Sequence, residues 1–279
     1  MKKVLLWVLA FVITAGSAVY QRMTGPTYAV NGNMQLGGSV ISFTLETTHE
    51  TIGDYEIKIE APDSEVSGYI QFKRFKTDDP WTNIQMERED GSISASLPQQ
   101  PSAGKLAYKV FLSYRGKEVS LTGEQEVVIR FKDVVPKTVL YLHILIIFSA
   151  MLFSTRTGIE ALRKEGNTRK LTLWTAGLMF GGGMILGPLV QKFAFGEWWT
   201  GVPFGFDLTD NKTLIAMIVW AIAVIAGRKG KQAKGWVLAA SIVTLVIFLI
   251  PHSLLGSELD YSQIENQVPQ TIALLIPKF

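Results

Sequence analysis

Three histidines, His49, His143 and His252, are the side chains of this chain best suited to bind a metal or to exchange protons near neutral pH. The chain has no cysteine, which excludes disulfides, thiolate zinc sites, iron–sulfur clusters and covalent c-type haem attachment. His143 lies near the start of one apolar segment, and His252 directly follows another. If both ends lie on the same side of a membrane, the two imidazoles reach comparable depth and could share a ligand.

Aromatic and acidic residues gather in the same stretches of sequence. Trp198, Trp199 and Phe204 belong to the Gly-, Pro- and aromatic-rich segment 196–212. Two neutral imidazoles could ligate one haem b iron axially while these aromatic rings pack on the porphyrin. A bare zinc, iron or copper ion is the alternative, bound by both histidines and by carboxylates. The candidate carboxylates are Asp207, Asp210, Glu258 and Asp260.

Each of these residues also has a purely structural interpretation. His143 could bond to a carbonyl of a neighbouring helix, and His252 could be a solvated residue beyond Pro251. Tryptophans are ordinary at a membrane interface, and Asp210 could be the N-cap of a helix. His49 lies in a polar run, which predicts a solvated loop histidine.

The elements that must position these residues include five apolar runs. A helix needs about 20 apolar residues to cross a bilayer core. The runs are 4–20, 138–153, 171–190, 213–226 and 235–250, the fourth extending back toward Leu208. The sequence therefore predicts an integral membrane protein with about five transmembrane helices.

Basic residues in the short loops predict the orientation. Lys2 and Lys3 precede the first run, and further lysines and arginines lie in loops 154–170 and 228–234. All three clusters fall on one side if every run spans, so the N-terminus is predicted to be cytoplasmic in a bacterial inner membrane. The first run also resembles a cleavable signal peptide, with small residues at 16–18.

Segment 27–133 alternates apolar and polar residues with the period of β-strands. Val40–Glu46, Tyr55–Glu60, Leu106–Ser113 and Val127–Phe131 are the clearest examples, and turn signals such as Asp90-Gly91 and Arg115-Gly116 separate the strands. The spacing predicts a β-sandwich of the immunoglobulin or fibronectin type III kind. Tyr108 has the placement of the tyrosine corner of such folds.

The predicted domains are an N-terminal helix (1–21), an extracytoplasmic β-sandwich (22–135), a four-helix membrane domain (136–255) and an extracytoplasmic tail (256–279). Segment 22–133 carries twelve Lys/Arg and sixteen Asp/Glu, which argues against a nucleic-acid partner because such a surface needs clustered basic residues. No Ser-His-Asp arrangement is legible. The glycines around 181–183 predict a close helix-packing face rather than a phosphate loop.

The layout of residues 138–260 resembles the tryptophan-rich haem-handling membrane proteins of cytochrome c biogenesis. That family has a tryptophan-rich outer loop flanked in sequence by one outer histidine on each side. Here Trp198-Trp199 lie between His143 and His252, and Asp210-Asn211-Lys212 leads toward Trp220. The family's full motif is absent, and a β domain is not part of its pattern. The resemblance implies haem handling at the outer face.

Two hypotheses of function follow. The first is a haem- or metal-binding component of an envelope electron-transfer or cofactor-handling system. The second is a non-catalytic assembly or scaffold subunit whose sandwich docks a periplasmic or membrane protein partner.

Overall fold

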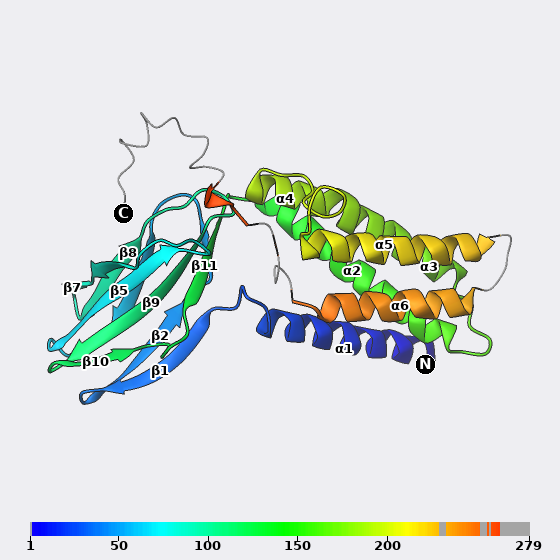
Figure 1. Cartoon of the computed structure of the whole chain (residues 1–279). Coiled ribbons are helices and arrows are strands. Elements are labelled where there is room, and N and C mark those ends of the chain that lie inside the picture. The colour runs from blue at the N-terminus through cyan, green and yellow to red at the C-terminus, as the bar shows by residue number, and fades with distance from the viewer. Residues whose placement is uncertain (1, 229–232, 252–255, 257, 263–279) are drawn as a thin grey trace. The chain divides into compact units, whose positions relative to one another are not determined.

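The computed structural model describes residues 2–228, 233–251, 256 and 258–262. The chain divides into two compact units (Figure 1). The helical unit comprises Met1–Tyr28 and Val135–Ser257, and the β unit comprises Ala29–Val134 and Glu258–Phe279. Each unit is therefore built from segments that are distant in the sequence.

The described part of the β unit contains eleven strands in three sheets. A six-stranded sheet has the order β3-β11-β9-β5-β6, with β10 also paired to β9, and the other two sheets are β1-β2 and β4-β8-β7. The strands are β1 (Val30–Leu36), β2 (Ser39–Leu45), β3 (Thr48–Glu50), β4 (Tyr55–Glu60), β5 (Val66–Arg74), β6 (Thr82–Gln85), β7 (Glu87–Glu89), β8 (Ser92–Leu97), β9 (Lys105–Tyr114), β10 (Lys117–Ser120) and β11 (Val127–Lys132).

The turns of the β unit follow the local sequence. Arg115 and Gly116 both have positive φ, 49° and 76°, and they connect the paired residues Tyr114 and Lys117. Two consecutive positive φ values define the type I′ hairpin, which matches the right-handed twist of the flanking strands. Asp90-Gly91 forms the same turn between β7 and β8. Both turns agree with the sequence-based prediction.

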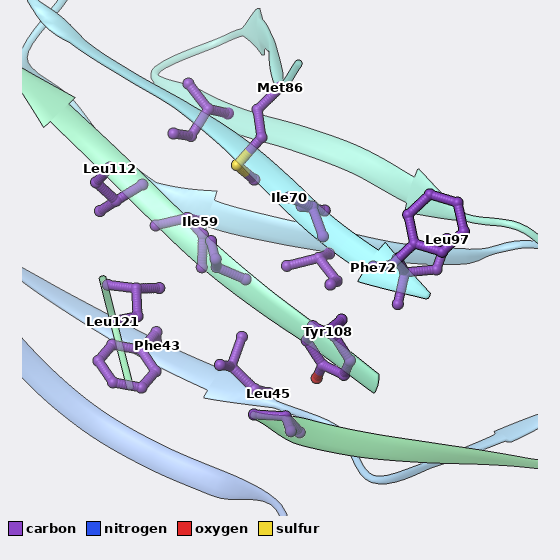
Figure 2. Close-up of a cluster of buried hydrophobic side chains, with 14 of the residues drawn as sticks. Phe43, Leu45, Ile59, Ile70, Phe72, Met86, Leu97, Tyr108, Leu112 and Leu121 are labelled. Atoms are coloured by element: carbon purple, nitrogen blue, oxygen red, sulfur yellow. The ribbon is translucent and has the colours of Figure 1, made fainter. Parts of the chain in front are cut away.

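The core of the β unit includes the residues that alternation predicted to point inward, together with others from β5 and β8 that were not predicted. Fully buried examples are Leu45, Ile59 and Leu112, and Figure 2 shows such side chains from several strands converging on one cluster. Tyr108 is also fully buried, and its hydroxyl donates a hydrogen bond to the Glu46 carbonyl at 2.8 Å. That acceptor lies 62 residues earlier in the chain, just after β2, so Tyr108 joins β9 to the end of β2 rather than closing a tyrosine corner.

His49 differs from its prediction as a solvated loop residue. It lies in β3, which pairs in parallel with β11. Its ring is partly buried and packs against Tyr55 and Phe131, with centroid distances of 5.2 and 5.7 Å. The strand was not predicted because an edge strand of three polar residues shows too little alternation to be recognised from the sequence.

The described part of the helical unit contains α1 (Lys2–Met23), α2 (Lys137–Ala161), α3 (Arg169–Met179), the π-helical segment η1 (Phe180–Leu186), α4 (Gly187–Phe195), α5 (Leu208–Ala226) and α6 (Lys234–Leu249). The segments α3, η1 and α4 form one continuous helix, Arg169–Phe195. Four of these helices are long and apolar enough to cross a membrane, and α6 is a shorter apolar helix. Their existence agrees with the five predicted runs.

Helix α2 extends eight residues beyond the predicted end at residue 153. The extension carries Arg156 and Glu160, which form a buried ion pair at 2.7 Å, and Glu160 also pairs with Arg163 at 2.8 Å. These residues had been assigned to a loop because charges normally end an apolar run. Here the i,i+4 spacing places opposite charges side by side on the helix, so the helix continues.

The helices pack through small residues and polar bonds. Ser241 of α6 donates to the Ser154 carbonyl of α2 at 2.9 Å, and Trp220 of α5 donates to Thr244 of α6 at 2.9 Å. A Cβ added to Gly158 would lie 2.2 Å from Ser241 Oγ, so α2 and α6 approach each other closely at this glycine. Polar side chains and small residues are the usual means of joining helices in a membrane.

Helix α1 is tied to the same unit. Gln21 donates to the carbonyls of Phe248 and Ile250 at 2.7 and 3.1 Å, at the end of α6. The ring of Trp7 packs edge-on against Phe153 with a centroid distance of 5.0 Å. These contacts join α1 to α2 and α6 within the helical unit.

Candidate functional site

His143 lies in the first two turns of α2 and is partly buried. Its Nδ1 is 3.0 Å from the carbonyl oxygen of Gly182. Since a carbonyl only accepts, Nδ1 carries a proton and donates this bond, and in the neutral ring Nε2 is then the acceptor. The structure therefore shows the helix-to-helix bond that was the structural alternative for His143, with one ring nitrogen still available.

The glycine-rich segment provides the acceptor for this bond. Gly182 lies in η1, and a Cβ there would come within 3.1 Å of the Ile147 backbone nitrogen, while one on Gly183 would lie 2.6 Å from Thr213 Cγ2. The predicted close-packing role thus holds for these two glycines. Gly177 and Gly181 have no atom within 4 Å of the added Cβ. Close packing is confined to the side of η1 that contacts α2 and α5.

His252 lies outside the described residues, so its predicted partnership with His143 stays a prediction. Among the residues that the structure does describe, no group of three or more His, Asp or Glu side chains is placed to hold a metal ion.

The aromatic loop between α4 and α5 is braced by acidic and amide side chains. The buried Asp210 carboxylate accepts from the backbone nitrogens of Thr200 and Gly201 at 2.6 and 3.0 Å. The Asn211 side-chain oxygen accepts from the Val202 nitrogen at 2.8 Å. The predicted role of Asp210 as an N-cap is wrong, because the N-cap of α5 is Asp207.

Asp207 accepts from the nitrogens of Thr209 and Asp210 at 2.7 and 3.3 Å, which satisfies two of the free donors at the start of α5. The sequence held the signal for this cap, because Asp207 immediately precedes the apolar run once that run is extended to Leu208. The two carboxylates of this loop therefore both hold backbone groups of their own loop and helix.

The three aromatic residues of this loop that were predicted to pack on a haem differ in their surroundings. Trp198 is 55% exposed and Phe204 is 82% exposed. Trp199 is partly buried, and its indole nitrogen donates to the Val202 carbonyl at 3.1 Å. The bracing thus fixes the base of the loop while Trp198 and Phe204 project from it.

Lys212 is a buried residue that was not among the candidate site residues predicted from the sequence. Its ammonium donates to the carbonyls of Ile250 and Pro251 at 3.0 and 3.3 Å, just beyond α6. A lysine in the first turns of an apolar helix was the available signal, since a buried ammonium needs acceptors.

Glu258 belongs to the β unit and forms ion pairs with Lys76 at 3.1 Å and Lys105 at 2.8 Å. Burial alone would raise the pKa of this carboxyl, but the hydrogen bonds from Lys105 and Lys76 outweigh it and lower the pKa. Asp260 accepts from the nitrogen and hydroxyl of Ser262 at 3.0 and 2.6 Å.

Tyr261 extends this contact between the C-terminal segment and the strands. Its hydroxyl accepts from the Lys105 nitrogen and donates to the Gln100 side chain, both at 3.0 Å. Its ring lies 5.0 Å from the Arg74 guanidinium. Residues 258–262, here called the C-terminal clip, are thus fastened to the β unit.

A second cluster, which the sequence analysis missed, lies on the outward face of the six-stranded sheet. Trp81 lies between two lysines, with the ammoniums of Lys73 and Lys109 at 5.2 and 5.5 Å from its ring centroid. Tyr69 and Phe111 stand opposite each other on β5 and β9, and their rings are stacked with a centroid distance of 5.0 Å. We call these five residues the basic-aromatic face.

The sheet β4-β8-β7 carries the opposite charge on its outward side. Glu56, Lys58 and Glu60 alternate with the buried Ile57 and Ile59 along β4. Register places Glu87 and Glu89 of β7 on the same side, across Ser94 and Ser92. All four glutamates and Lys58 are exposed. The two outward faces of the β unit therefore differ in both charge and aromatic content.

No protein family matches this chain. No curated protein matches it either. Among solved structures it is similar to one described as "Crystal structure of Br derivative BhCBM56", with 15% identity over 38% of this chain and 95% of that chain, at a TM-score of 0.24. A likeness at that TM-score carries no argument about fold or function.

Proposed function

We propose that this chain is a non-catalytic membrane scaffold, whose helices anchor a β unit that docks a protein partner outside the cytoplasm. In this proposal all five helices span a bacterial inner membrane, and the three sheets form a β-sandwich. The orientation is supported by Arg163 and Lys164 in the short connection after α2 and by Arg169 and Lys170 at the start of α3, since basic residues favour the cytoplasmic side.

The observation that carries the proposal is that the polar groups of the predicted cofactor site already serve the chain's own structure. Asp207 caps a helix, Asp210 braces the aromatic loop, and Glu258 pairs with two lysines. A carboxylate that ligates a metal would have to give up such partners. Each of these groups instead fixes one segment of the protein to another, as expected for a scaffold.

The test uses single cysteines, because the natural chain has none. Three variants are made separately: Gln71→Cys on the basic-aromatic side, Glu56→Cys on the acidic side and Glu165→Cys after α2. Intact cells that carry each variant are then treated with a membrane-impermeant thiol reagent. Positions 71 and 56 should be labelled and position 165 should not. Labelling at position 165, or none at 71 and 56, contradicts the orientation.

Docking is tested with the same variants and a thiol-reactive photocrosslinker. Position 71 should give a discrete crosslinked product with another protein, and the matched position 56 should not. If neither position forms an adduct in the native membrane, the docking role is wrong.

Haem or metal binding is a second candidate that one observation favours. Ligating histidines commonly donate their other ring N–H to a carbonyl, and His143 does so to Gly182. If His143 and His252 hold a haem b, the protein purified from haem-supplemented cells should show a Soret band that shifts on reduction. His143→Ala should weaken it and His49→Ala should not. A bare metal would instead appear in elemental analysis, and finding neither rejects this candidate.

A further inference from the structure

The basic-aromatic face is assembled by the register of strands β5 and β9. On β5, Gln71 pairs with Lys109 of β9. Tyr69, two residues before Gln71, pairs with Phe111, and Lys73 lies two residues after Gln71 on the same side of the sheet. The alternate residues Ile70 and Phe72 point into the core. Trp81 precedes β6, the next strand of the sheet. Neighbouring strands therefore place three rings and two ammoniums on one side of the sheet.

The ring geometry shows what this face offers to a ligand. Two rings lying flat and side by side on a sheet would have centroids farther apart than 5.0 Å, so Tyr69 and Phe111, with an interplanar angle of 10°, face each other across the strands. The ring of Trp81 is in turn occupied by the ammoniums of Lys73 and Lys109. Ring edges carry partial positive charge. The face therefore presents positive edges and ammoniums rather than broad free ring faces.

Several other cations of the β unit are paired with carboxylates, unlike the two on this face. Arg74 pairs with Asp79, Lys105 with Glu258, and Arg115 with Glu65. Within the described residues, Lys73 and Lys109 form no ion pair, and the ammoniums of both lie close to the indole ring of Trp81. Two unpaired ammoniums held over one ring are a site for negative charge.

Gln71, Asn83 and Gln85 also surround the rings, and the Glu118 carboxylate interacts with the Tyr69 hydroxyl at the far side from the two lysines. Pairing places Asn83 opposite Gln71 and Gln85 opposite Tyr69, so the three amides lie on the same side of the sheet. Side-chain amides bond to peptide groups with both a donor and an acceptor. Aromatic residues, in particular Trp and Tyr, are also the usual anchors of protein interfaces.

We infer that the basic-aromatic face binds an acidic segment of a protein partner. Carboxylates of the segment contact Lys73 and Lys109, its backbone contacts the amides, and its apolar parts cover Tyr69 and Phe111. A neutral glycan is disfavoured because stacking a sugar requires a free ring face. The inference rests on the proposed docking function and names the chemistry of the docked partner.

The test uses the full chain in detergent and a fluorescent peptide of alternating Glu and Ser, with anisotropy as the readout. The Glu/Ser peptide should bind, and the matched Gln/Ser peptide should bind at least several-fold more weakly. Binding should weaken between low and physiological salt, because exposed charges are screened over about 8–10 Å. Polygalacturonate, a carboxylate polymer without peptide groups, distinguishes an acidic protein segment from an anionic glycan.

Lys73→Ala combined with Lys109→Ala should weaken binding of the Glu/Ser peptide by roughly five- to tenfold, the effect of losing two partly exposed ion pairs. The control variant, Lys58→Ala with Lys117→Ala, removes the same amount of charge outside the basic-aromatic face and should not change binding of the Glu/Ser peptide. Trp81→Ala should also weaken binding. Equal thermal midpoints for the two double variants show that both are folded.

The inference is overturned if the Glu/Ser peptide does not bind, if both double variants weaken it equally, or if polygalacturonate binds as tightly per carboxylate. Any of these results leaves the crosslinking test at position 71 unaffected, so failure of the inference and failure of the docking function are separable.

Discussion

The interior of the β unit and the interior of the helical unit are stabilised by different interactions. The core of the β unit contains large apolar side chains such as Phe131, Leu106 and Ile70, which are fully buried. The core of the helical unit contains many alanines, with Ser154, Thr157 and Thr175 buried beside them. In water, burial of apolar surface drives folding. Between helices in lipid that drive is absent, and close packing with interhelical hydrogen bonds replaces it.

The largest expected effect tests the β side of this comparison. Residues 25–134 expressed alone should be soluble and unfold cooperatively, because the apolar core lies almost entirely within them. In that fragment Phe131→Ala should lower the free energy of unfolding by about 3–5 kcal/mol, the cost of emptying a buried aromatic site. Val128→Ala, on the same strand but less buried, should cost much less. Denaturant unfolding followed by circular dichroism measures both, and a random-coil spectrum of the fragment would contradict the comparison.

A substitution of intermediate effect tests the helical side. Gly158→Leu should separate α2 from α6, since even a Cβ at this position overlaps Ser241. Overpacking of this kind costs typically 1–3 kcal/mol. The thermal midpoint of the full chain in detergent should fall. Gly177→Leu is the matched control, because nothing lies within 4 Å of its added Cβ. Equal losses in both variants would show that close approach at Gly158 is not what stabilises the bundle.

The smallest effect concerns the C-terminal clip and depends on pH. The ion pairs lower the pKa of Glu258 in the folded protein below its ordinary value of 4.5. Their stabilisation is therefore fully present at pH values above 4.5. It is lost as the pH falls through the lower pKa of the folded state. Glu258→Gln should therefore destabilise the full chain at pH 7 by at most about 1 kcal/mol, because Lys76 is largely exposed. At pH 3 the difference from the natural chain should shrink. An equal deficit at both pH values would mean that charge is not the cause.

The strands, turns and helices that depend on local sequence patterns were predicted from the sequence. Alternation along β2, β4 and β9 identified the buried residues, and Arg115-Gly116 identified a turn, because both signals involve only neighbours in the chain. The apolar runs identified the helices for the same reason. Helix ends were less accurate where ion pairing extends a helix, as with Arg156 and Glu160.

Contacts between distant segments were not predictable. Nothing near Lys105 in the sequence indicates that Glu258 and Tyr261 will bind beside it. The basic-aromatic face was missed because its members come from two strands and a loop, and their meeting depends on register. For the candidate ligands, residue type suggested metal chemistry, whereas the structure assigns Asp207 and Asp210 to capping and bracing. The pairing of His143 with His252 stays a prediction.

The C-terminal clip also affects how the protein is made. The strands of the β unit leave the ribosome before α2, yet Glu258 and Tyr261, which bind to Lys105 and Gln100, emerge only after α6. Synthesis proceeds from the N-terminus, and early segments fold while later ones are still absent. These contacts of the β unit therefore form only after α6 has been synthesised. A chain truncated before residue 258 would contain all eleven described strands but would lack the contacts that Glu258 and Tyr261 make with them.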